Sequence, residues 1–286
     1  MLVNMGGARN EMELKLFLKN MFRDKRIIPS PLRYLISAIV PSIRYQKVWK
    51  NYEQIGGSQI YSITEKLVQE MQKTTHRKVV YAMRYTSPDI ASVVSQFDDI
   101  IVIPMYPHYS TTTVESIIDE IEKVNFRGQI KILDPFYKNK IFNQLVINSI
   151  YSQIDKPENW HLIFSAHGIP VTITRKGDPY TKQIREHAEI LSEKLVDFKS
   201  ISLGYQSKVG PVQWEKPYLN NLLKDYKGKN VLIYPISFLI DNSETDYELK
   251  IEYAKIAEKV GVNKYKVVDC LNDTKEFIYF LINLSK

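Results

Sequence analysis

Residues 160–170 read WHLIFSAHGIP, an apolar run that ends in an abrupt chain break. The run stops at Ala166, and Gly168 and Pro170 follow shortly afterwards. A short apolar segment bounded by such residues is typical of a strand buried in a parallel sheet. The sequence therefore predicts a strand over residues 160–166, with His167 just beyond its carboxyl end.

The same pattern of short β-branched runs recurs along the chain, where it alternates with segments of helical length. This order is typical of an α/β protein with parallel strands. We predict further strands at residues 1–5, 78–83, 100–105, 129–133, 200–204 and 231–235, and helices at residues 11–21, 59–72, 113–124, 139–152, 182–195, 214–226, 244–260 and 274–285.

The predicted elements form two similar halves, which meet at the polar stretch QIDKPEN of residues 153–159. We expect an N-terminal domain over residues 1–152 and a C-terminal domain over residues 153–263. The final segment, residues 264–286, is expected to pack back on the N-terminal domain. Each half is long enough to bury a core of its own.

The composition of the 286 residues argues against several classes of protein. A single cysteine, Cys270, allows no intrachain disulfide and indicates a reducing, cytoplasmic setting. The longest run without Asp, Glu, Lys or Arg, residues 159–174, is too short and too broken to span a bilayer. The 39 Lys and Arg exceed the 32 Asp and Glu but form no compact basic block with interleaved aromatics, so we expect no nucleic-acid partner.

The familiar cofactor and nucleophile motifs are missing from the sequence. Ligands of open parallel sheets bind beyond the carboxyl ends of the strands, which is where His167 is expected. Neither G-x-G-x-x-G nor G-x-x-x-x-G-K-[ST] occurs, and G-x-S-x-G and H-E-x-x-H are also missing. Dinucleotide binding, phosphoryl transfer, esterase chemistry and zinc proteolysis therefore lose support, and His167 remains as a candidate acid or base.

A second candidate cluster lies in the acidic stretch of residues 241–252, DNSETDYELKIE. Glu244, Glu248 and Glu252 recur every four residues, so on a helix they form a ladder along one face. Such a row of carboxylates could bind a divalent cation or pass protons. A solvated acidic face is the alternative, because Lys250 lies within the same stretch.

Six motifs follow one another from the first predicted strand to the last long helix and cover nearly the whole chain. Together they resemble the ferrochelatase family, whose members insert ferrous iron into a porphyrin. The resemblance implies two Rossmann-like domains, each a parallel sheet flanked by helices, with the active-site cleft between them. The motifs are LVNMGG at residues 2–7, MRY at 83–85, YPHYSTTT at 106–113, FSAHGIP at 164–170 with GDPY at 177–180, YQSKVGP with Trp214 at 205–214, and PISFLIDNSETDYELKIEY at 235–253.

The resemblance implies catalytic roles for His167 and Glu244, which would also contact the iron. Metallation must remove two pyrrole protons, and a neutral imidazole accepts a proton near neutral pH. Imidazole and carboxylate are both acceptable ligands of Fe²⁺. The resemblance further implies porphyrin-binding residues Met5, Arg84, Tyr85, Tyr106, Ser165 and Phe238, and relay or accessory metal residues Glu248, Glu252, Asp241 and His108.

Several of these roles have a structural alternative. Arg84 could pair with a porphyrin propionate or order the site through hydrogen bonds. Tyr85, Tyr106 and Phe238 stand beside strand ends, where aromatic residues also form plain core. His108 could cap local structure or contact the metal.

Two departures from the family pattern bear on the expected cofactor, and one motif bears on the expected substrate. Asn242 stands where animal members carry a second histidine, and no cysteine-rich extension is present, so we expect no iron–sulfur cluster and no tightly bound cofactor. Residues 5–7 resemble the branch that uses protoporphyrin. We therefore expect insertion of Fe²⁺ into protoporphyrin IX in heme biosynthesis. The alternatives are coproporphyrin III as substrate, a non-catalytic tetrapyrrole or metal carrier, and a cobalt or nickel chelatase for another tetrapyrrole.

Residues 27–45, IIPSPLRYLISAIVPSIRY, are apolar, punctuated by proline and flanked by basic residues. This pattern suits a segment that lies on an anionic membrane surface. The resemblance implies a hydrophobic lip at the mouth of the cleft, and a helix buried in the core is the alternative. We expect a cytoplasmic monomer that contacts the membrane peripherally.

Overall fold

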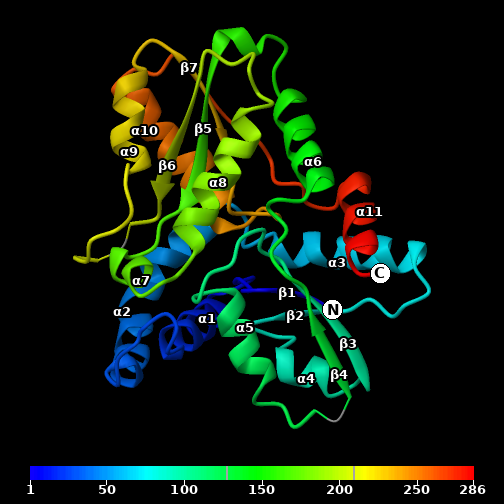
Figure 1. Cartoon of the computed structure of the whole chain (residues 1–286). Coiled ribbons are helices and arrows are strands. Elements are labelled where there is room, and N and C mark those ends of the chain that lie inside the picture. The colour runs from blue at the N-terminus through cyan, green and yellow to red at the C-terminus, as the bar shows by residue number, and fades with distance from the viewer. Residues whose placement is uncertain (127, 209) are drawn as a thin grey trace. The chain divides into compact units, whose positions relative to one another are not determined.

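The computed structural model of the chain describes residues 1–126, 128–208 and 210–286. Arg127 and Val209 lie outside the described residues, and Val209 falls inside the motif of residues 205–214. The chain forms two compact units, which Figure 1 shows with their elements labelled. The first unit contains Met1–Pro135 and Asn272–Lys286, and the second contains Phe136–Leu271.

The first unit is built on four parallel strands in the order β2-β1-β3-β4. Val3 of the central strand, Ala82 and Val102 pack with Ile117 in its core, and all four are buried. The strands are β1 (Leu2–Asn4), β2 (Tyr81–Met83), β3 (Asp99–Pro104) and β4 (Gln129–Ile132), and the helices are α1 (Glu11–Arg23), α2 (Arg33–Glu53), α3 (Ile60–Thr74), α4 (Ile90–Val94), α5 (Val114–Ile121) and α11 (Lys275–Leu284).

The second unit is built on four parallel strands in the order β6-β5-β7-β8. Ile163, Val231 and Ile233 of this sheet pack with Leu249 in a buried core. The strands are β5 (Trp160–His167), β6 (Ser200–Gln206), β7 (Asn230–Tyr234) and β8 (Lys264–Val267), and the helical segments are α6 (Lys140–Tyr151), η1 (Pro157–Asn159), α7 (Val171–Arg175), α8 (Tyr180–Ser192), α9 (Leu219–Leu222), η2 (Leu223–Tyr226), the π-helix η3 (Glu244–Glu252) and α10 (Tyr253–Val260).

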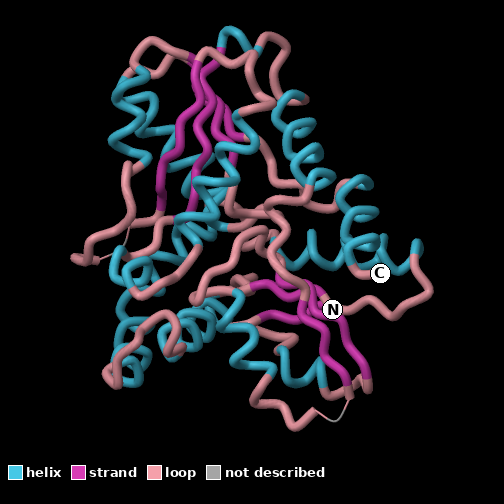
Figure 2. Tube along the Cα trace, viewed as in Figure 1, coloured by secondary structure: helices cyan, strands magenta, loops and turns pink. Residues whose placement is uncertain are grey.

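Both sheets repeat one strand order, in which the first strand lies between the second and the third. Figure 2 shows the strands of the two sheets in magenta and the helices in cyan. The order reverses between β5 and β7, and ligands of open α/β sheets bind outside the strand ends at such a reversal. β5 pairs with β6 as far as His167 but with β7 only as far as Phe164. The last residues of β5 therefore extend beyond the end of β7, and the segments that follow the two strands can meet there.

Several helices begin where a side chain caps the first turn. Asn10 accepts a hydrogen bond from the Glu13 N–H at 2.9 Å, at the start of α1. Asn139 accepts one from the Ile141 N–H at 2.9 Å, at the start of α6. Such caps satisfy donors that the helix itself leaves unpaired. They explain why the predicted starts at residues 11 and 139 lie within one residue of the observed ones.

The units divide at residues other than the expected ones. The boundary follows Pro135 rather than residue 152, because α6 packs in the second unit: its Asn143 accepts a hydrogen bond from His187 of α8 at 3.0 Å. The tail joins the first unit from Asn272, and α11 packs against α3. Residues 264–267 instead form β8 of the second sheet.

All seven predicted strands are present, and the differences concern other elements. β8 was not predicted, because its sequence KYKV carries the exposed lysines typical of an edge strand. The helix expected over residues 214–226 begins only at Leu219, because Trp214 and Tyr218 form bridges to other segments. Residues 244–252 form a π-helix where an α-helix was expected.

Candidate active site

His167 is the last residue of β5, and hydrogen bonds from two side chains fix its backbone. Its N–H donates to the Ser237 hydroxyl oxygen at 3.0 Å. The Tyr180 hydroxyl lies 2.7 Å from the Ser237 hydroxyl and donates to the His167 carbonyl oxygen at 2.9 Å. Both backbone groups of His167 are thus engaged, which sets the direction of its imidazole. Tyr180 belongs to the GDPY motif, so two motifs that stand out in the sequence are joined by direct contact.

Gly168 lets the chain turn directly after the histidine. Its N–H donates to the Gln206 carbonyl oxygen at 3.0 Å. A Cβ on Gly168 would lie 2.9 Å from that same oxygen, closer than side chains tolerate. Glycine is therefore required by this close approach to the end of β6.

Glu244 is the first residue of the π-helix η3, in the segment after β7. The Asn242 side-chain oxygen accepts the Glu244 N–H at 2.9 Å, and the Asn242 N–H donates to Thr245 Oγ1 at 2.9 Å. Thr245 and Leu249 are fully buried and seat the helix on the sheet. Asn242 therefore caps the helix start, and π-helical turns of this kind often occur at functional sites.

His167 and Glu244 are 77 residues apart in the sequence but in direct contact. The distance from His167 Nδ1 to Glu244 Oε2 is 2.7 Å, and the two side chains are 37% and 23% exposed. When Nδ1 donates to a carboxylate, the lone pair of a neutral imidazole is on Nε2. The contact therefore orients Nε2 to accept a proton or to bind a metal.

Ser207 connects Glu244 to Glu248 and was not among the predicted site residues. Its backbone N–H donates to Glu248 Oε1 at 2.8 Å, and its hydroxyl lies 2.6 Å from Glu248 Oε2 and 3.2 Å from Glu244 Oε2. Its φ of 67° lies in the left-handed region, which non-glycine residues adopt rarely and often at functional sites. Its place directly after β6 was the available signal, since ligands bind beyond such strand ends.

The pKa values of the three ionisable groups are shifted in different directions. Burial raises the pKa of Glu248 to about 7, and the charge of Glu244 adds to this effect. Burial also opposes ionisation of Glu244, but its contact with His167 outweighs burial and lowers the pKa of Glu244. Burial lowers and the Glu244 carboxylate raises the pKa of His167, and the net shift is upward. The His167–Glu244 pair thus holds one proton firmly, while Glu248 can exchange one near neutral pH.

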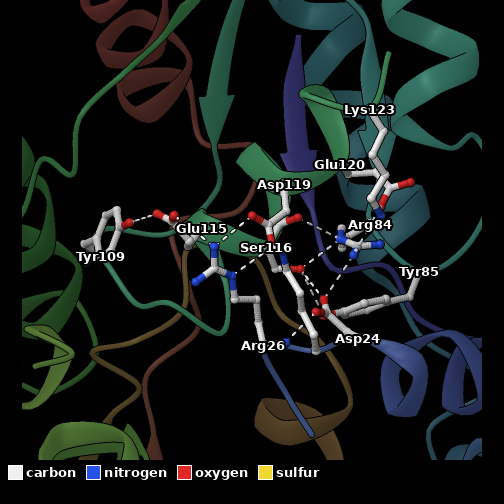
Figure 3. A network of polar contacts seen from close by, with 11 residues as sticks. Asp24, Arg26, Arg84, Tyr85, Tyr109, Glu115, Ser116, Asp119, Glu120 and Lys123 are labelled. Carbon is white, nitrogen blue, oxygen red and sulfur yellow. Dashed lines mark hydrogen bonds and ion pairs between the residues drawn. The ribbon is translucent and has the colours of Figure 1, made fainter. Parts of the chain in front are cut away.

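Arg84 and Tyr85 lie in the first unit, in the separate polar network of Figure 3. Arg84 Nη2 lies 3.0 Å from Asp24 Oδ2 and 3.2 Å from Glu120 Oε2, and Arg84 Nε donates to Ser116 Oγ at 2.8 Å. Tyr85 is buried, and its hydroxyl donates to Asp24 Oδ2 at 2.9 Å. The Nε and Nη2 atoms of Arg84 therefore contact groups of the protein, and the Tyr85 ring is buried in the core.

The remaining predicted residues are spread over both units. Ser165 is fully buried and donates to Gln206 Oε1 at 2.6 Å. Asp241 is buried beside Lys250, whose Nζ lies 3.8 Å from Asp241 Oδ1, and Glu252 is exposed on η3. The others are Met5 and Tyr106, which are partly buried in the first unit, His108, which is buried there, and Phe238, which is partly buried in the second.

Of the residues expected to contact a metal, the structure brings together His167, Glu244 and Glu248. In the part of the chain that the structure describes, no group of three or more His, Cys, Asp or Glu side chains is arranged to hold a metal ion. The arrangement offers one imidazole nitrogen and a carboxylate pair, which suits the transfer of protons and transient contact with a metal ion.

Known proteins are similar to this chain over nearly its full length. The family model described as Ferrochelatase matches residues 1–286. A ferrochelatase of a Nitratiruptor species is 40% identical over 300 residues, which cover 99% of this chain and 97% of that protein. A ferrochelatase of Campylobacter concisus is 40% identical over 305 residues, which cover 100% of this chain and 96% of that protein.

Solved structures resemble the chain in fold. SirB from Bacillus subtilis with Fe³⁺ has a TM-score of 0.57 at 14% identity and covers 78% of this chain and 89% of its own. CbiX, described as the terminal enzyme of siroheme biosynthesis in denitrifying bacteria, has a TM-score of 0.55 at 13% identity and covers 78% of this chain and 88% of its own. At such identities the likeness concerns the α/β architecture alone.

Proposed function

Because this chain belongs to the ferrochelatase family, it is a porphyrin metal chelatase of heme biosynthesis, and we propose that His167, Glu244 and Glu248 carry its proton transfers. The observation that supports this assignment is the 2.7 Å contact between His167 Nδ1 and Glu244 Oε2, with Glu248 joined to it through Ser207. The porphyrin and ferrous iron are the substrates. We propose that no resident cofactor takes part, because the sequence contains a single cysteine and an iron–sulfur cluster is held by several.

Insertion of Fe²⁺ breaks two pyrrole N–H bonds, and the nitrogen lone pairs that are released bind the metal. His167 Nε2 accepts one of these protons, because Nδ1 is directed at Glu244. The Glu244 carboxylate stabilises the imidazolium that forms, and this is the reason for the raised pKa of His167. Glu248, whose pKa lies at about 7, accepts the second pyrrole proton at neutral pH and releases it to water.

We infer that the porphyrin is protoporphyrin IX. Coproporphyrin III carries four propionates and protoporphyrin only two, so the former needs more cationic partners. Arg84, a residue expected to meet a propionate, is already paired with Asp24 and Glu120. Met5 packs beside an apolar cluster that contains Phe17, as suits a wall for an apolar macrocycle. These features favour the less charged substrate.

An anaerobic assay of Fe²⁺ insertion into protoporphyrin IX and coproporphyrin III tests both proposals. We expect a higher kcat/KM with protoporphyrin, and loss of metallation in His167→Ala. Faster turnover of coproporphyrin III would contradict the substrate, and full activity of His167→Ala would contradict the site.

The N-terminal half of α2 presents apolar side chains to solvent, and we propose that they contact a membrane surface. Leu35, Ile39 and Ile43 are 58%, 47% and 72% exposed, so a buried core helix does not describe this segment. Arg44 and Lys47 stand on the same helix and suit anionic lipid headgroups. No helix in the described ranges is long and apolar enough to cross a membrane. We infer a monomer that works in the cytoplasm and touches the membrane from its surface.

Flotation with anionic liposomes tests the membrane contact. We expect the unmutated protein to float, and the double variant Leu35→Asp with Ile39→Asp to remain at the bottom of the gradient. Ile141→Asp is the matched control, because Ile141 is also an exposed aliphatic residue but lies on α6. The contact is rejected if the unmutated protein does not float, or if the control fails to float as well.

A further inference from the structure

Lys250 of η3 lies among three carboxylates and was not among the predicted site residues. Its Nζ lies 2.8 Å from Asp269 Oδ1, 3.0 Å from Asp246 Oδ1 and 3.8 Å from Asp241 Oδ1. The side chains of Asp241 and Asp246 are only 6% and 10% exposed, whereas that of Asp269 is 61% exposed. Burial alone would lower the pKa of Lys250, but the three carboxylates outweigh burial and raise it. The ammonium therefore stays charged and held by its partners at neutral pH.

The three carboxylates around Lys250 come from different segments of the second unit. Asp241 belongs to the segment between β7 and η3, Asp246 to η3 itself, and Asp269 lies two residues beyond Val267, where β8 ends. Asp246 Oδ2 is buried and accepts no hydrogen bond from any residue that the structure describes, so Asp246 relies on the ammonium to compensate its charge. Lys250 thus joins η3 to the segments that follow β7 and β8.

A second contact joins β8 to the same part of η3. The Tyr265 hydroxyl of β8 donates to the Leu249 carbonyl oxygen at 3.0 Å. Leu249 directly precedes Lys250, so both contacts act on the C-terminal half of η3. In this half the Tyr253 N–H donates to the Glu248 carbonyl oxygen five residues back, which is the spacing of a π-helix. β8 and the segment after it therefore hold the part of η3 that carries Glu248.

Glu248 and Lys250 hold η3 from different sides, since residues two apart on a helix do not face each other. On one side, Glu248 accepts the Ser207 N–H at 2.8 Å and the Ser207 hydroxyl at 2.6 Å. On another side, Lys250 is held by Asp269. Contacts on two sides leave the helix little freedom to rotate about its axis.

We propose that Lys250 is a positioning residue that fixes the rotation of η3 and thereby holds Glu244 against His167 for proton transfer. The proposal rests on the proposed function, because it concerns the same pair. Rotation of η3 would move Glu244 Oε2 away from His167 Nδ1, which lies 2.7 Å from it. A misplacement of about 1 Å in an active site can lower the rate about a hundredfold. Asp241, which was expected to be an accessory metal residue, helps to hold Lys250 in this assignment.

Anaerobic steady-state kinetics of three variants test the positioning. Lys250→Met keeps an unbranched side chain but loses the charge, so kcat should fall about thirtyfold while the KM for porphyrin stays within about twofold. Lys250→Arg keeps a charge that reaches the same carboxylates and should restore kcat to within about threefold. Lys255→Met, an exposed lysine on α10, is the control and should leave both constants unchanged.

Three kinetic results would overturn the proposal. They are a kcat of Lys250→Met equal to that of the control, a rise in KM without a fall in kcat, and failure of the arginine to restore kcat. A double variant then shows whether Lys250 acts through Glu244. Glu244→Gln has already lost the carboxylate that Lys250 positions, so adding Lys250→Met should lower kcat by less than about twofold more. A further fall as large as in Lys250→Met alone would contradict positioning of Glu244.

Hydrogen exchange of residues 244–252 gives a readout that does not depend on turnover. We expect about tenfold faster exchange there in Lys250→Met. Asp269→Asn removes the closest partner of Lys250 at an exposed position, so it should speed exchange as well without loss of folding, and it decides the question if Lys250→Met does not fold. Unchanged exchange in the variants that fold would overturn the proposal. Failure of the unmutated protein to metallate any porphyrin would contradict the proposed function, while the exchange result would still decide whether Lys250 holds η3.

Discussion

The carboxylates of the two polar networks in this molecule have different partners and opposite pKa shifts. In the first unit, Asp24 and Asp119 each meet an arginine, Arg84 and Arg26. In the second unit, Glu244 contacts the imidazole of His167, and Glu244 and Glu248 share the hydroxyl of Ser207. Hydrogen bonds from Arg26 lower the pKa of Asp119 to about 2, whereas burial raises the pKa of Glu248 to about 7.

These pKa values indicate that the first network holds its segments in place and that the second exchanges protons. A carboxylate locked in a fork with arginine stays ionised at every physiological pH and can only position its neighbours. A carboxylate that lacks a full counter-charge changes its protonation near neutrality, which proton transfer to and from a substrate requires. The network in the second unit is thus suited to proton transfer. The network in the first unit is suited to holding neighbouring segments in place.

The largest effect is expected from Glu244→Gln. The amide keeps the shape of the side chain but cannot stabilise the imidazolium of His167, so kcat should fall about a thousandfold while the KM for porphyrin changes little. Steady-state kinetics under anaerobic conditions measure both constants. Glu252→Gln is the control, because Glu252 is an exposed residue on the same helix. An equally large fall in kcat in this control would contradict a specific role of Glu244.

Glu248→Gln should show a large effect of a different kind, on stability. The folded-state pKa of about 7 lies above the ordinary value of 4.5, so the folded protein binds this proton more tightly than the unfolded chain. Its stabilising effect is complete below pH 4.5 and is lost as the pH rises through 7. Glu248→Gln removes the cost of ionisation, so it should be more stable than the unmutated protein by roughly 2 kcal/mol at pH 8, and by much less at pH 4.

Urea unfolding at the two pH values measures this difference. Because the amide oxygen of the substituted side chain can still accept the Ser207 N–H, the substitution should leave the π-helix intact. An equal change in stability at pH 4 and pH 8 would show that packing, and not ionisation, is responsible.

The strands of both sheets and the contacting pair His167 and Glu244 could be singled out from the sequence, for a physical reason that also explains what was missed. His167 and Glu244 carry their signal locally, as a strand end with a chain break and as an acidic ladder. Ser207 acts through a left-handed backbone conformation, and Asp24 through burial of its carboxylate by three donors from other elements. Neither property is visible in residue type or spacing, because both arise only when distant segments pack.

Arg84 is a further residue whose contacts could not be predicted from residue type and spacing. Its residue type suits a propionate, and its position after a strand fits a substrate-binding segment. The structure assigns its donors to Asp24, Glu120 and Ser116, which are brought to it by the α1–α2 turn and by α5. What a charged residue binds depends on which opposite charge the fold places nearest, and sequence spacing does not give that distance.

Ser207→Gly isolates the hydroxyl that joins the two carboxylates. Glycine adopts the φ of 67° without strain and keeps the N–H that binds Glu248 Oε1, so only the hydroxyl contacts are lost. We expect kcat to fall about tenfold, in line with one lost charge-assisted hydrogen bond. The kcat of Ser207→Ala should fall by about the same factor, because alanine removes the same hydroxyl and bears the backbone strain that Ser207 already bears. A glycine variant whose kcat falls much further than that of the alanine variant would show that the backbone conformation, and not the hydroxyl, is responsible.

Asp119→Asn should give the smallest effect and the opposite pH dependence to Glu248→Gln. The folded-state pKa of Asp119 is about 2, below the ordinary 3.8, so its contribution to stability is complete above pH 3.8 and is lost as the pH falls through 2. Because Arg26 is partly exposed, the screened pair should be worth only about 1 kcal/mol, and Asp119→Asn should lose that amount at pH 7. Urea unfolding at pH 7 and pH 2.5 should show the loss shrinking toward acid. A loss that grows toward acid would mean that Asp119, like Glu248, is protonated in the folded protein, and the contrast between the two networks would fail.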